Sequence, residues 1–529
     1  KARNSQKEVL TSIESAFKKG YKNVLLEAPV GSGKSAIAVT IARYLRDAHI
    51  LTPRKALQDQ YSSDFSKHGL ALMKGRNAYP CTYPSYDDEN YNKVYRTISQ
   101  GIPYDFASGE LTCSEGPCLR QKKIKDQCTE YDPVSKVESY PCPYHVAILK
   151  AQERQIVVHN LHSFIFQAYF SGRFDKRKVL IIDECHEIEN VIRGFASKKI
   201  TIPKFLSEEN LKETENFKTL ADWATWFSSF SNLFSQEKDK FGVSPQDVYK
   251  DMVYTLHTLS DIFGTNFVTD INKDPLLKKS IFEFIPEYVG NLANKYLFDF
   301  GDKRVLMSGT IYNKTMFCKT IGIKEDETCF IRIGSSFPKN NRPIYFKPEY
   351  RVDTSHKLWD ENFAKLIKTL SNIFDIFNDV KGLVHTPSYS ASNSIASALS
   401  KYSDRIVTHS KDNFQSILTD FYKSTDPKIL LSPVCQQGVD FKEDRARFQV
   451  IIRVPYLNVS DAFVDTKVKN DFSWYNYQAL ILFGQQIGRI NRSEKDFGAT
   501  ILIDDRFSSF LKRNSNILPK WVTEAIIYK

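Results

Sequence analysis

The sequence predicts an α/β protein built on two parallel β-sheets, and three features carry that prediction. An apolar run at 24–26 leads into a glycine-rich loop and a helical pattern that continues past residue 41. A second apolar run, at 179–182, is followed by two carboxylates. From about residue 335 onward, helical stretches alternate with short apolar runs such as 429–431 and 450–452. Strands that alternate with helices usually form parallel sheets with helices on both faces.

The glycine-rich loop predicts a site for a nucleotide polyphosphate. Glycines let backbone N–H groups turn inward on phosphates, and the following helix adds its positive dipole end. The loop departs from the pattern G-x-x-x-x-G-K-S/T at its first position, which is Ala28. In that pattern the lysine reaches the β- and γ-phosphates and the hydroxyl binds Mg²⁺. The residues expected to bind ATP and Mg²⁺ are Gly31, Ser32, Gly33, Lys34 and Ser35.

The two carboxylates that follow the run 179–182 are Asp183 and Glu184. They lie where a parallel sheet binds its ligands, at the carboxyl ends of the strands. We expect Asp183 to hold Mg²⁺, mostly through water, and Glu184 to orient and deprotonate the attacking water.

The spacing of the motifs predicts two inserted domains. A strand–helix–strand unit takes roughly 30 residues. Asp183 follows Ser35 by 148 residues, and the next motif begins at Ser308, a further 125 residues on. Both gaps are longer than a compact nucleotide-binding domain needs.

Five of the nine cysteines fall within one segment of about sixty residues, at Cys81, Cys113, Cys118, Cys128 and Cys142. Zinc sites usually combine two close cysteine pairs, and only Cys113 and Cys118 form one here. The pattern therefore fits zinc poorly and allows a 4Fe–4S cluster with four cysteine ligands. Scattered thiols without a metal are the alternative.

The bulk composition sets weaker bounds. A net charge of +11 over 529 residues favours polyanionic partners, although dispersed surface lysines would give the same sum. No apolar run reaches the roughly 18 residues of a membrane-spanning helix, and no hydrophobic stretch at the start predicts a secretory signal. We therefore expect no membrane partner, and a cytoplasmic protein in a prokaryote or a nuclear one in a eukaryote.

Together the motifs resemble those of superfamily 2 nucleic-acid helicases, most closely the XPD-type iron–sulfur DNA helicases, over nearly the whole chain. The loop resembles the family's Ala-Pro-x-Gly-x-Gly-Lys-Ser/Thr, and residues 183–186 resemble its Asp-Glu-x-His box. Thr52-Pro53-Arg54 resembles a DNA-contacting segment, which implies a DNA contact by Arg54. Ser308-Gly309-Thr310 resembles the motif that couples hydrolysis to strand movement. The absence of an extended C-terminal tail resembles a minimal, archaeal-like form.

The second half carries further family motifs. Residues 383–389 match a strand ending in Pro-Ser-Tyr, and 438–441 match Glu-Gly-Ile-Asp-Phe with Gln437 at the usual acidic position. Residues 485–492 fit Gln-x-x-Gly-Arg-x-x-Arg. The resemblance implies nucleotide contacts by Asp440 and Gln485. Arg489 and Arg492, at helical i, i+3 spacing, are candidate arginine fingers that reach the γ-phosphate from the facing domain.

The resemblance also assigns roles near the N-terminus and in the first insertion. Gln6 occupies the place of the family's adenine-reading glutamine. Segments 75–81 and 140–144 resemble the borders of the family's iron–sulfur domain, whose outer ligands are cysteines. We expect Cys81, Cys113, Cys118 and Cys142 to hold the cluster, with Cys128 as the alternative to Cys118.

The second insertion is expected to be helical. Apolar residues recur at three-four spacing from Phe217 to Phe234 and again from Val248 to Phe263. In the resembling family this position carries a helical arch domain.

The resulting architecture has two RecA-like motor domains with both insertions in the first. The expected ranges are 1–75, 151–204 and 296–333 for motor domain 1, 76–150 for the iron–sulfur domain, 205–295 for the arch and 334–529 for motor domain 2.

The resemblance implies an ATP-dependent DNA helicase that moves 5′→3′ on single-stranded DNA, unwinds forked duplexes and takes part in DNA repair. We expect a monomeric motor with partners in a repair complex. The alternatives are a DinG-type iron–sulfur helicase acting on R-loops or recombination intermediates, and an ATP-driven RNA helicase or remodeller. An adaptor that binds ATP without turnover would be expected to lack Lys34, Asp183, Glu184 or Arg489, and all four are present.

Overall fold

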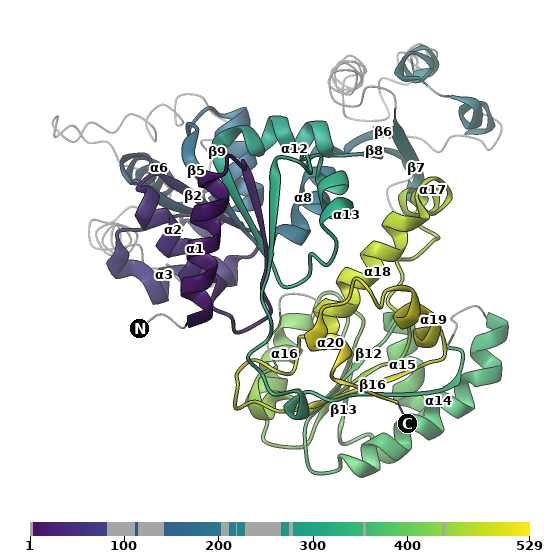
Figure 1. The fold of residues 1–529 in the computed structure, drawn as a ribbon. Coiled ribbons are helices and arrows are strands. Elements are labelled where there is room, and N and C mark those ends of the chain that lie inside the picture. The colour runs from purple at the N-terminus through teal and green to yellow at the C-terminus, as the bar shows by residue number, and fades with distance from the viewer. Residues whose placement is uncertain are drawn as a thin grey trace.

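The computed structural model describes residues 4–81, 112–114, 142–202, 211–217, 219–227, 266–274, 279–352, 356–435, 439 and 441–528. Figure 1 shows two α/β halves, one above the other, with the first described residue in the upper half and the last in the lower. Among the helices of these residues, none combines the length and apolar character that crossing a bilayer requires.

The first half contains a seven-stranded sheet in which every strand pair is parallel. In spatial order its strands are β10 (Thr328–Arg332), β1 (Asn23–Glu27), β9 (Gly301–Ser308), β5 (Arg177–Asp183), β2 (Ala48–Thr52), β4 (Ile156–Asn160) and β3 (Ala71–Met73). Its helices are α1 (Asn4–Lys18), α2 (Lys34–Leu45), α3 (Lys55–Phe65), α6 (Pro143–Glu153), α7 (Leu161–Ile165), α8 (Ile188–Ala196), α12 (Gly290–Tyr296) and α13 (Lys314–Ile321).

Both faces of this sheet are buried, as the unbroken apolar runs predict. In β5, Val179 and Ile181 pack in the cluster under α1 and α2, whereas Leu180 and Ile182 pack in the cluster under α8 and α12. Successive strand residues point to opposite faces, so such a strand must be apolar at every position.

The second half contains another seven-stranded parallel sheet. Its order is β13 (Ile406–Val407), β14 (Ile429–Ser432), β12 (Gly382–His385), β15 (Phe448–Ile451), β16 (Ala499–Asp504), β11 (Ile344–Tyr350) and β17 (Ile526–Tyr528). Its helices are α14 (His356–Ile376), α15 (Tyr389–Ala398), α16 (Phe414–Lys423), α17 (Ala462–Asn470), α18 (Phe472–Ile487), α19 (Arg506–Arg513) and α20 (Lys520–Thr523). The two parallel sheets confirm the predicted fold class.

Helix α18 joins the halves, and Figure 1 shows it running diagonally between them. Its apolar residues Leu480 and Phe483 belong to the same buried cluster as Leu306 of β9 and Phe317 of α13. One hydrophobic core therefore continues from the first half into the second.

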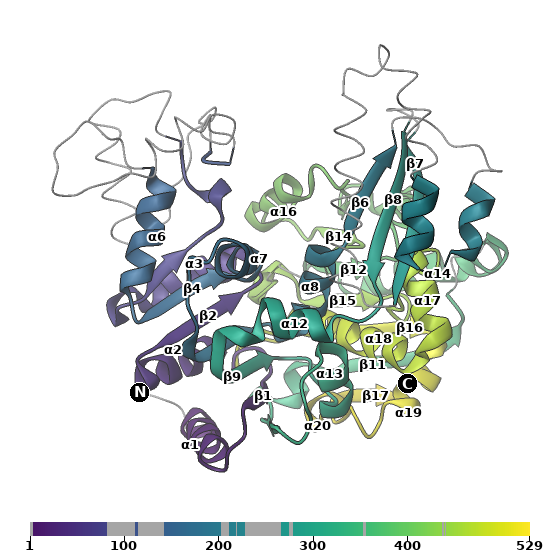
Figure 2. The same ribbon diagram turned by 90° about the horizontal axis from the view of Figure 1, so that it is seen from above.

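A small antiparallel sheet corrects the expectation that the second insertion is helical. It consists of β6 (Lys198–Ile202), β8 (Lys279–Pro286) and β7 (Phe267–Asp274), so two of its strands lie within 205–295. Figure 2 shows these strands side by side, projecting from the body of the first half. The residues of β8 alternate between buried and half-buried, which is the period of a strand with one buried face.

The predicted aromatic stripe covers this sheet. Trp223, Trp226 and Phe227 pack on Phe282 and Phe284 of β8. The aromatic run is therefore the core of a helix-on-sheet unit. Phe230, Phe234 and the stripe from Val248 to Phe263 lie outside the described residues.

The close approach of β12 and β15 makes a prediction about stability. Gly382 pairs with Phe448, and a Cβ at Gly382 would overlap the Phe448 ring. We expect Gly382→Ala to destabilise the second half by about 1–3 kcal/mol through overpacking. Thermal unfolding measures this, with Gly194→Ala as the control because that helical glycine has nothing near its Cβ position. Equal melting temperatures for both variants would contradict the packing.

Candidate nucleotide site

The predicted phosphate-binding loop lies between β1 and α2. Gly31 and Gly33 have φ angles of 76° and 82°, in the left-handed region that glycine adopts readily. A Cβ at Gly31 would overlap the Phe337 ring, and one at Gly33 would overlap the Gln6 amide. Lys34 begins α2, and its Nζ donates a hydrogen bond of 3.2 Å to the Ala28 carbonyl.

The structure brings Gln6 to the same loop. Its Nε2 donates to the Ser32 carbonyl at 3.3 Å, across 26 residues of sequence. Helix α1 therefore carries this side chain to the phosphate-binding loop.

Asp183 ends β5 and is almost fully buried, with 2% of its surface exposed. The Tyr61 hydroxyl donates to its Oδ2 at 3.1 Å and also bonds to Ser35. Burial, followed by the neighbouring charge of Glu184, raises the pKa of Asp183. Tyr61 thus bridges the two side chains expected to bind Mg²⁺.

Glu184 has a φ of 55°, an uncommon backbone conformation for a residue with a side chain. Burial alone would raise the pKa of Glu184. The charges of Lys34, His186, Arg54 and Arg489 outweigh burial and hold that pKa below its usual value. These nearby cations therefore keep the Glu184 carboxylate ionised.

A chain of close polar contacts leads from the carboxylates toward the second half. His186 Nδ1 lies 3.3 Å from Glu184 Oε2 and 2.8 Å from Ser308 Oγ. Ser308 Oγ accepts from the Thr310 amide at 3.1 Å. Gln485 Nε2, at the end of α18, donates to Thr310 Oγ1 at 2.8 Å. The motif at 308–310 thus lies between the carboxylates of one half and Gln485 of the other.

Arg489 and Arg492 follow α18 and are not part of it, which corrects the expectation of helical spacing. The helix ends at Ile487, Gly488 is its C-cap, and the Asp496 carboxylate accepts from the Arg492 amide at 3.0 Å. A glycine at a helix end and a carboxylate holding the next turn favour termination.

The Arg489 guanidinium is held within its own half. It donates to the Gln485 carbonyl at 2.9 Å, to Gln485 Oε1 at 2.8 Å and to the Val439 carbonyl at 2.8 Å. Burial, together with the charges of Arg492 and Arg54, lowers the pKa of Arg489 to about 9. These three arginines therefore lie in one electropositive region, next to Glu184.

Arg54 lies at the edge of this region. It precedes α3, and its Nη2 lies 3.7 Å from Glu187 Oε1. Its side chain is about a quarter exposed, at 23%. The positive charge of Arg54, the residue predicted to bind DNA, therefore also lowers the pKa values of Glu184 and Glu187.

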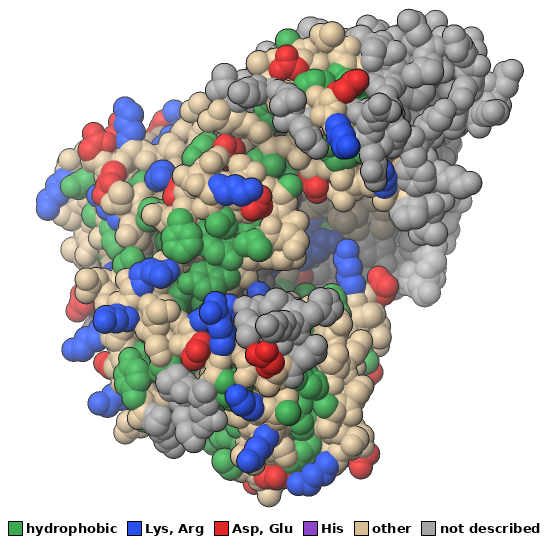
Figure 3. Space-filling view, turned by 90° about the vertical axis from the view of Figure 1, so that its right-hand side faces the viewer, with side chains coloured by type: hydrophobic (Ala, Val, Ile, Leu, Met, Phe, Trp, Pro, Cys, Tyr) green, Lys and Arg blue, Asp and Glu red, His purple; other side chains and the backbone are tan. Residues whose placement is uncertain are grey.

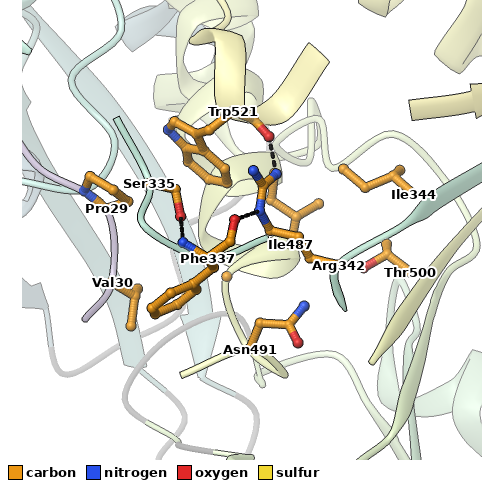
Figure 4. A pocket seen from close by; sticks show the side chains of 11 residues that line it. Pro29, Val30, Ser335, Phe337, Arg342, Ile344, Ile487, Asn491, Thr500 and Trp521 are labelled. Carbon is orange, nitrogen blue, oxygen red and sulfur yellow. Dashed lines mark hydrogen bonds between the residues drawn. The ribbon is translucent and has the colours of Figure 1, made fainter. Parts of the chain in front are cut away.

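A small cavity separates the phosphate-binding loop from the second half. Its volume is about 40 Å³, and Pro29, Val30, Phe337, Asn491 and Trp521 are among its lining residues (Figure 4). Arg342 fixes this wall, because its guanidinium donates to the carbonyls of Phe337 and Trp521. The loop thus faces residues of the second half across a narrow gap.

Three of the predicted cluster ligands lie in described segments. Cys113 Sγ is 3.5 Å from Cys142 Sγ and 3.0 Å from the Pro80 carbonyl, and Cys81 is near enough to influence Cys113 electrostatically. A hydrogen bond from Cys113, and then backbone N–H groups at the start of α6, lower the pKa of Cys142, although burial opposes this. The donor set fits a thiolate-bound metal in part. Over the described residues, however, no group of three metal-binding side chains is formed.

Three predicted site residues lie outside the described part of the chain, and three residues at the site were not predicted. Asp440, Cys118 and Cys128 lie outside the described residues. Sequence analysis missed Tyr61 and His186 as partners of the carboxylates, and no sequence spacing relates Tyr61 to Asp183. It also missed Glu27, whose position as a carboxylate at the end of an apolar strand was a usable signal.

Two family models match the chain, one for each half. A model described as type III restriction enzyme, res subunit matches residues 1–205, and a helicase C-terminal domain matches 371–525.

Curated relatives match short segments. The Fanconi anemia group J protein homolog of Gallus gallus is 32% identical over 137 residues, 22% of this chain and 11% of that protein. The regulator of telomere elongation helicase 1 homolog of Caenorhabditis elegans is 31% identical over 106 residues, 17% of this chain and 10% of that protein. The matches span about a tenth of the length of these relatives.

Solved structures match over the full chain. A structure named XPD_Helicase aligns with a TM-score of 0.62 and 16% identity, covering 100% of both chains. The structure of S. tokodaii Xpd4 aligns with a TM-score of 0.58 and 16% identity, also covering 100% of both. The chain thus has the fold of these XPD helicase structures over its whole length, and its second half matches the helicase C-terminal domain in sequence.

Proposed function

We propose that the chain is an ATP-dependent DNA helicase that translocates 5′→3′ on single-stranded DNA and unwinds duplexes, as in DNA repair. The observation that carries the proposal is the series of polar contacts that runs from Glu184 to His186 at 3.3 Å and continues by hydrogen bonds through Ser308 and Thr310 to Gln485. It links the carboxylates expected to drive hydrolysis to the half that would move. A site divided between two halves can convert hydrolysis into their relative movement.

The chemistry follows from the placement of the side chains. Lys34 and the backbone of the loop would bind the phosphates, while Ser35 and Asp183 would hold Mg²⁺. Glu184, ionised in this environment, would accept the proton of the attacking water. Arg489 and Arg492 would exchange their present carbonyl partners for the γ-phosphate and neutralise its developing charge.

The proposed DNA partner is a polyanion, so it would be bound by cationic side chains of the protein. On the face in Figure 3, Lys and Arg side chains lie among acidic ones without a large field of a single sign. Specific contacts such as that of Arg54, near the carboxylates, would therefore matter more than a general positive surface.

The first experiment measures unwinding of duplexes with either a 5′ or a 3′ single-stranded tail. We expect ATP-dependent unwinding of the 5′-tailed substrate and little of the other. Preference for the 3′ tail would contradict the direction, and ATP hydrolysis that DNA or RNA does not stimulate would contradict the helicase. Stimulation by RNA alone would favour an RNA remodeller.

Removal of the loop lysine tests the nucleotide site. Lys34→Ala should reduce DNA-stimulated ATP turnover at least about 100-fold, because it removes the cation that neutralises the transferring phosphate. Steady-state phosphate release measures this, with the exposed Lys19→Ala as control. Undiminished turnover in Lys34→Ala would refute the assignment of the loop.

The Tyr61–Asp183 hydrogen bond predicts a change in pH dependence. Tyr61→Phe removes a bond that stabilises the carboxylate, so the pKa of Asp183 should rise further. Mg²⁺ binding needs the ionised form of Asp183. As the pH is lowered, the variant should therefore lose activity earlier than wild type, so that the acidic limb of the kcat/KM profile moves upward by roughly half to one pH unit. Tyr44→Phe, at a residue 71% exposed, is the matched control. An unmoved limb would show that Asp183 does not govern it.

We further propose a 4Fe–4S cluster held by Cys81, Cys113, Cys142 and one of Cys118 and Cys128. The convergence of Cys113 and Cys142 supports it, because their sulfurs lie 3.5 Å apart; the contact between them lowers the pKa of Cys142 and raises that of Cys113. Such a cluster would pin together chain segments that are distant in sequence.

Anaerobically purified protein should then be yellow-brown and contain about four irons per chain. Cys81→Ser should lose the colour and the unwinding but keep most of the ATPase, because Cys81 belongs to neither motor sheet and is not part of the nucleotide site. Cys329→Ser, in β10, should keep the colour. A colourless protein that contains zinc would refute the cluster.

A further inference from the structure

Tyr312 follows the motif at 308–310 and lies where the two halves meet, and both its backbone and its side chain are constrained. Its φ is 59°, in the left-handed region, where residues with side chains are uncommon. Its hydroxyl is buried and has no hydrogen-bond partner among the residues that the structure describes. Both features cost free energy and persist only where the surroundings enforce them.

The backbone of Tyr312 is held by an ion pair at the base of the phosphate-binding loop. Glu27, the last residue of β1, accepts from the Tyr312 amide. Arg332, the last residue of β10, donates to the Tyr312 carbonyl at 2.6 Å, and its Nε lies 2.6 Å from Glu27 Oε1. Strand register places Glu27 directly beside Arg332, so the sheet itself builds this clamp.

The side chain of Tyr312 reaches the second half. A Cβ at Gly484 of α18 would overlap its hydroxyl, so only glycine leaves room for the ring. The two preceding residues also contact α18: the Ile311 carbonyl accepts from the Tyr477 hydroxyl at 2.7 Å, and Thr310 accepts from Gln485. Tyr477 and Gly484 are seven residues apart and therefore lie on one helix face.

Three consecutive residues thus dock on one face of α18, and the last of them is fixed to the phosphate-binding loop. Gly484 directly precedes Gln485, whose carbonyl and side chain hold the Arg489 guanidinium. Glu27 and Arg489 are therefore connected by contacts through Tyr312 and α18.

We propose that Tyr312 is a positioning residue, held by Glu27 and Arg332, that sets the place of α18 and hence of Arg489 relative to the phosphate-binding loop. This inference rests on the proposed function, in which Arg489 acts on the γ-phosphate. It assigns Tyr312 no contact with the nucleotide.

The test compares Tyr312→Phe, Tyr312→Ala and Gly484→Ala in DNA-stimulated ATP hydrolysis. Tyr312→Phe keeps the ring and removes only the unpartnered hydroxyl, so turnover should stay within about twofold of wild type. Tyr312→Ala should lower kcat roughly tenfold and leave KM for ATP within about twofold, because it misplaces an arginine without touching bound ATP. Binding of a fluorescent non-hydrolysable ATP analogue should be unchanged, and Tyr44→Ala serves as the control.

The double variant separates positioning from simple damage. Gly484→Ala should be impaired because its Cβ meets Tyr312, and adding Tyr312→Ala should restore part of the lost kcat. Recovery is partial, since the same Cβ would lie 2.8 Å from Thr310 Cγ2. Should Tyr312→Ala not fold, Tyr312→Leu replaces it in both arms.

Unchanged kcat in Tyr312→Ala, equal loss of kcat and nucleotide binding, or a double variant slower than Gly484→Ala would each overturn the assignment. A wild-type chain without ATPase activity would contradict the proposed function itself. The two failures are therefore distinguishable.

Discussion

The docking of α18 on the loop after β9 is the interaction on which the divided site depends. Apolar residues of α18 complete the core of the first half, and polar contacts fix the register of the helix along it. One of these contacts is expensive to lose: the buried Glu189 carboxylate accepts from Trp474 Nε1 at 2.9 Å and from Gln478 at 2.8 Å. A buried carboxylate without such partners would cost several kcal/mol. The halves therefore meet at a defined position.

At this position, cationic side chains from both halves surround the Glu184 carboxylate. Lys34 and Arg54 of the first half and Arg489 of the second all lower the pKa of Glu184, and burial together with the charges of Arg492 and Arg54 lowers the pKa of Arg489. Cations brought this close together repel one another, and the Glu184 carboxylate among them offsets only part of that repulsion, since the pKa of Arg489 remains lowered. A bound polyphosphate would add further negative charge and stabilise the halves in contact. The arrangement thus favours binding of the ligand that the loop is shaped to hold.

The parts of this arrangement that could be predicted from sequence are those encoded locally. Unbroken apolar runs and the glycine-rich loop predicted both parallel sheets and the positions of Lys34 and Asp183. Strands β7 and β8 were not predicted, because the aromatic residues that precede them in this insertion have the three-four spacing of a helix. Lys279–Pro286 nevertheless alternates as a strand does. Arg489 and Arg492 were expected on a helix, which Gly488 ends. Tyr61 and Tyr312 could not have been predicted, since their roles arise from contacts between residues distant in sequence.

The order of strands explains why the loop after β9 became the contact point. Strand β9 lies between β1, which ends at the phosphate-binding loop, and β5, which ends at the carboxylates. Register places Ser308 beside Glu27 and Met307 beside Asp183. Residues 308–312 therefore contact both parts of the site: Glu27 through Tyr312, and Glu184 through His186 and Ser308. In the proposed helicase, a helix docked on this loop would respond both to ATP binding at the phosphate-binding loop and to hydrolysis at the carboxylates.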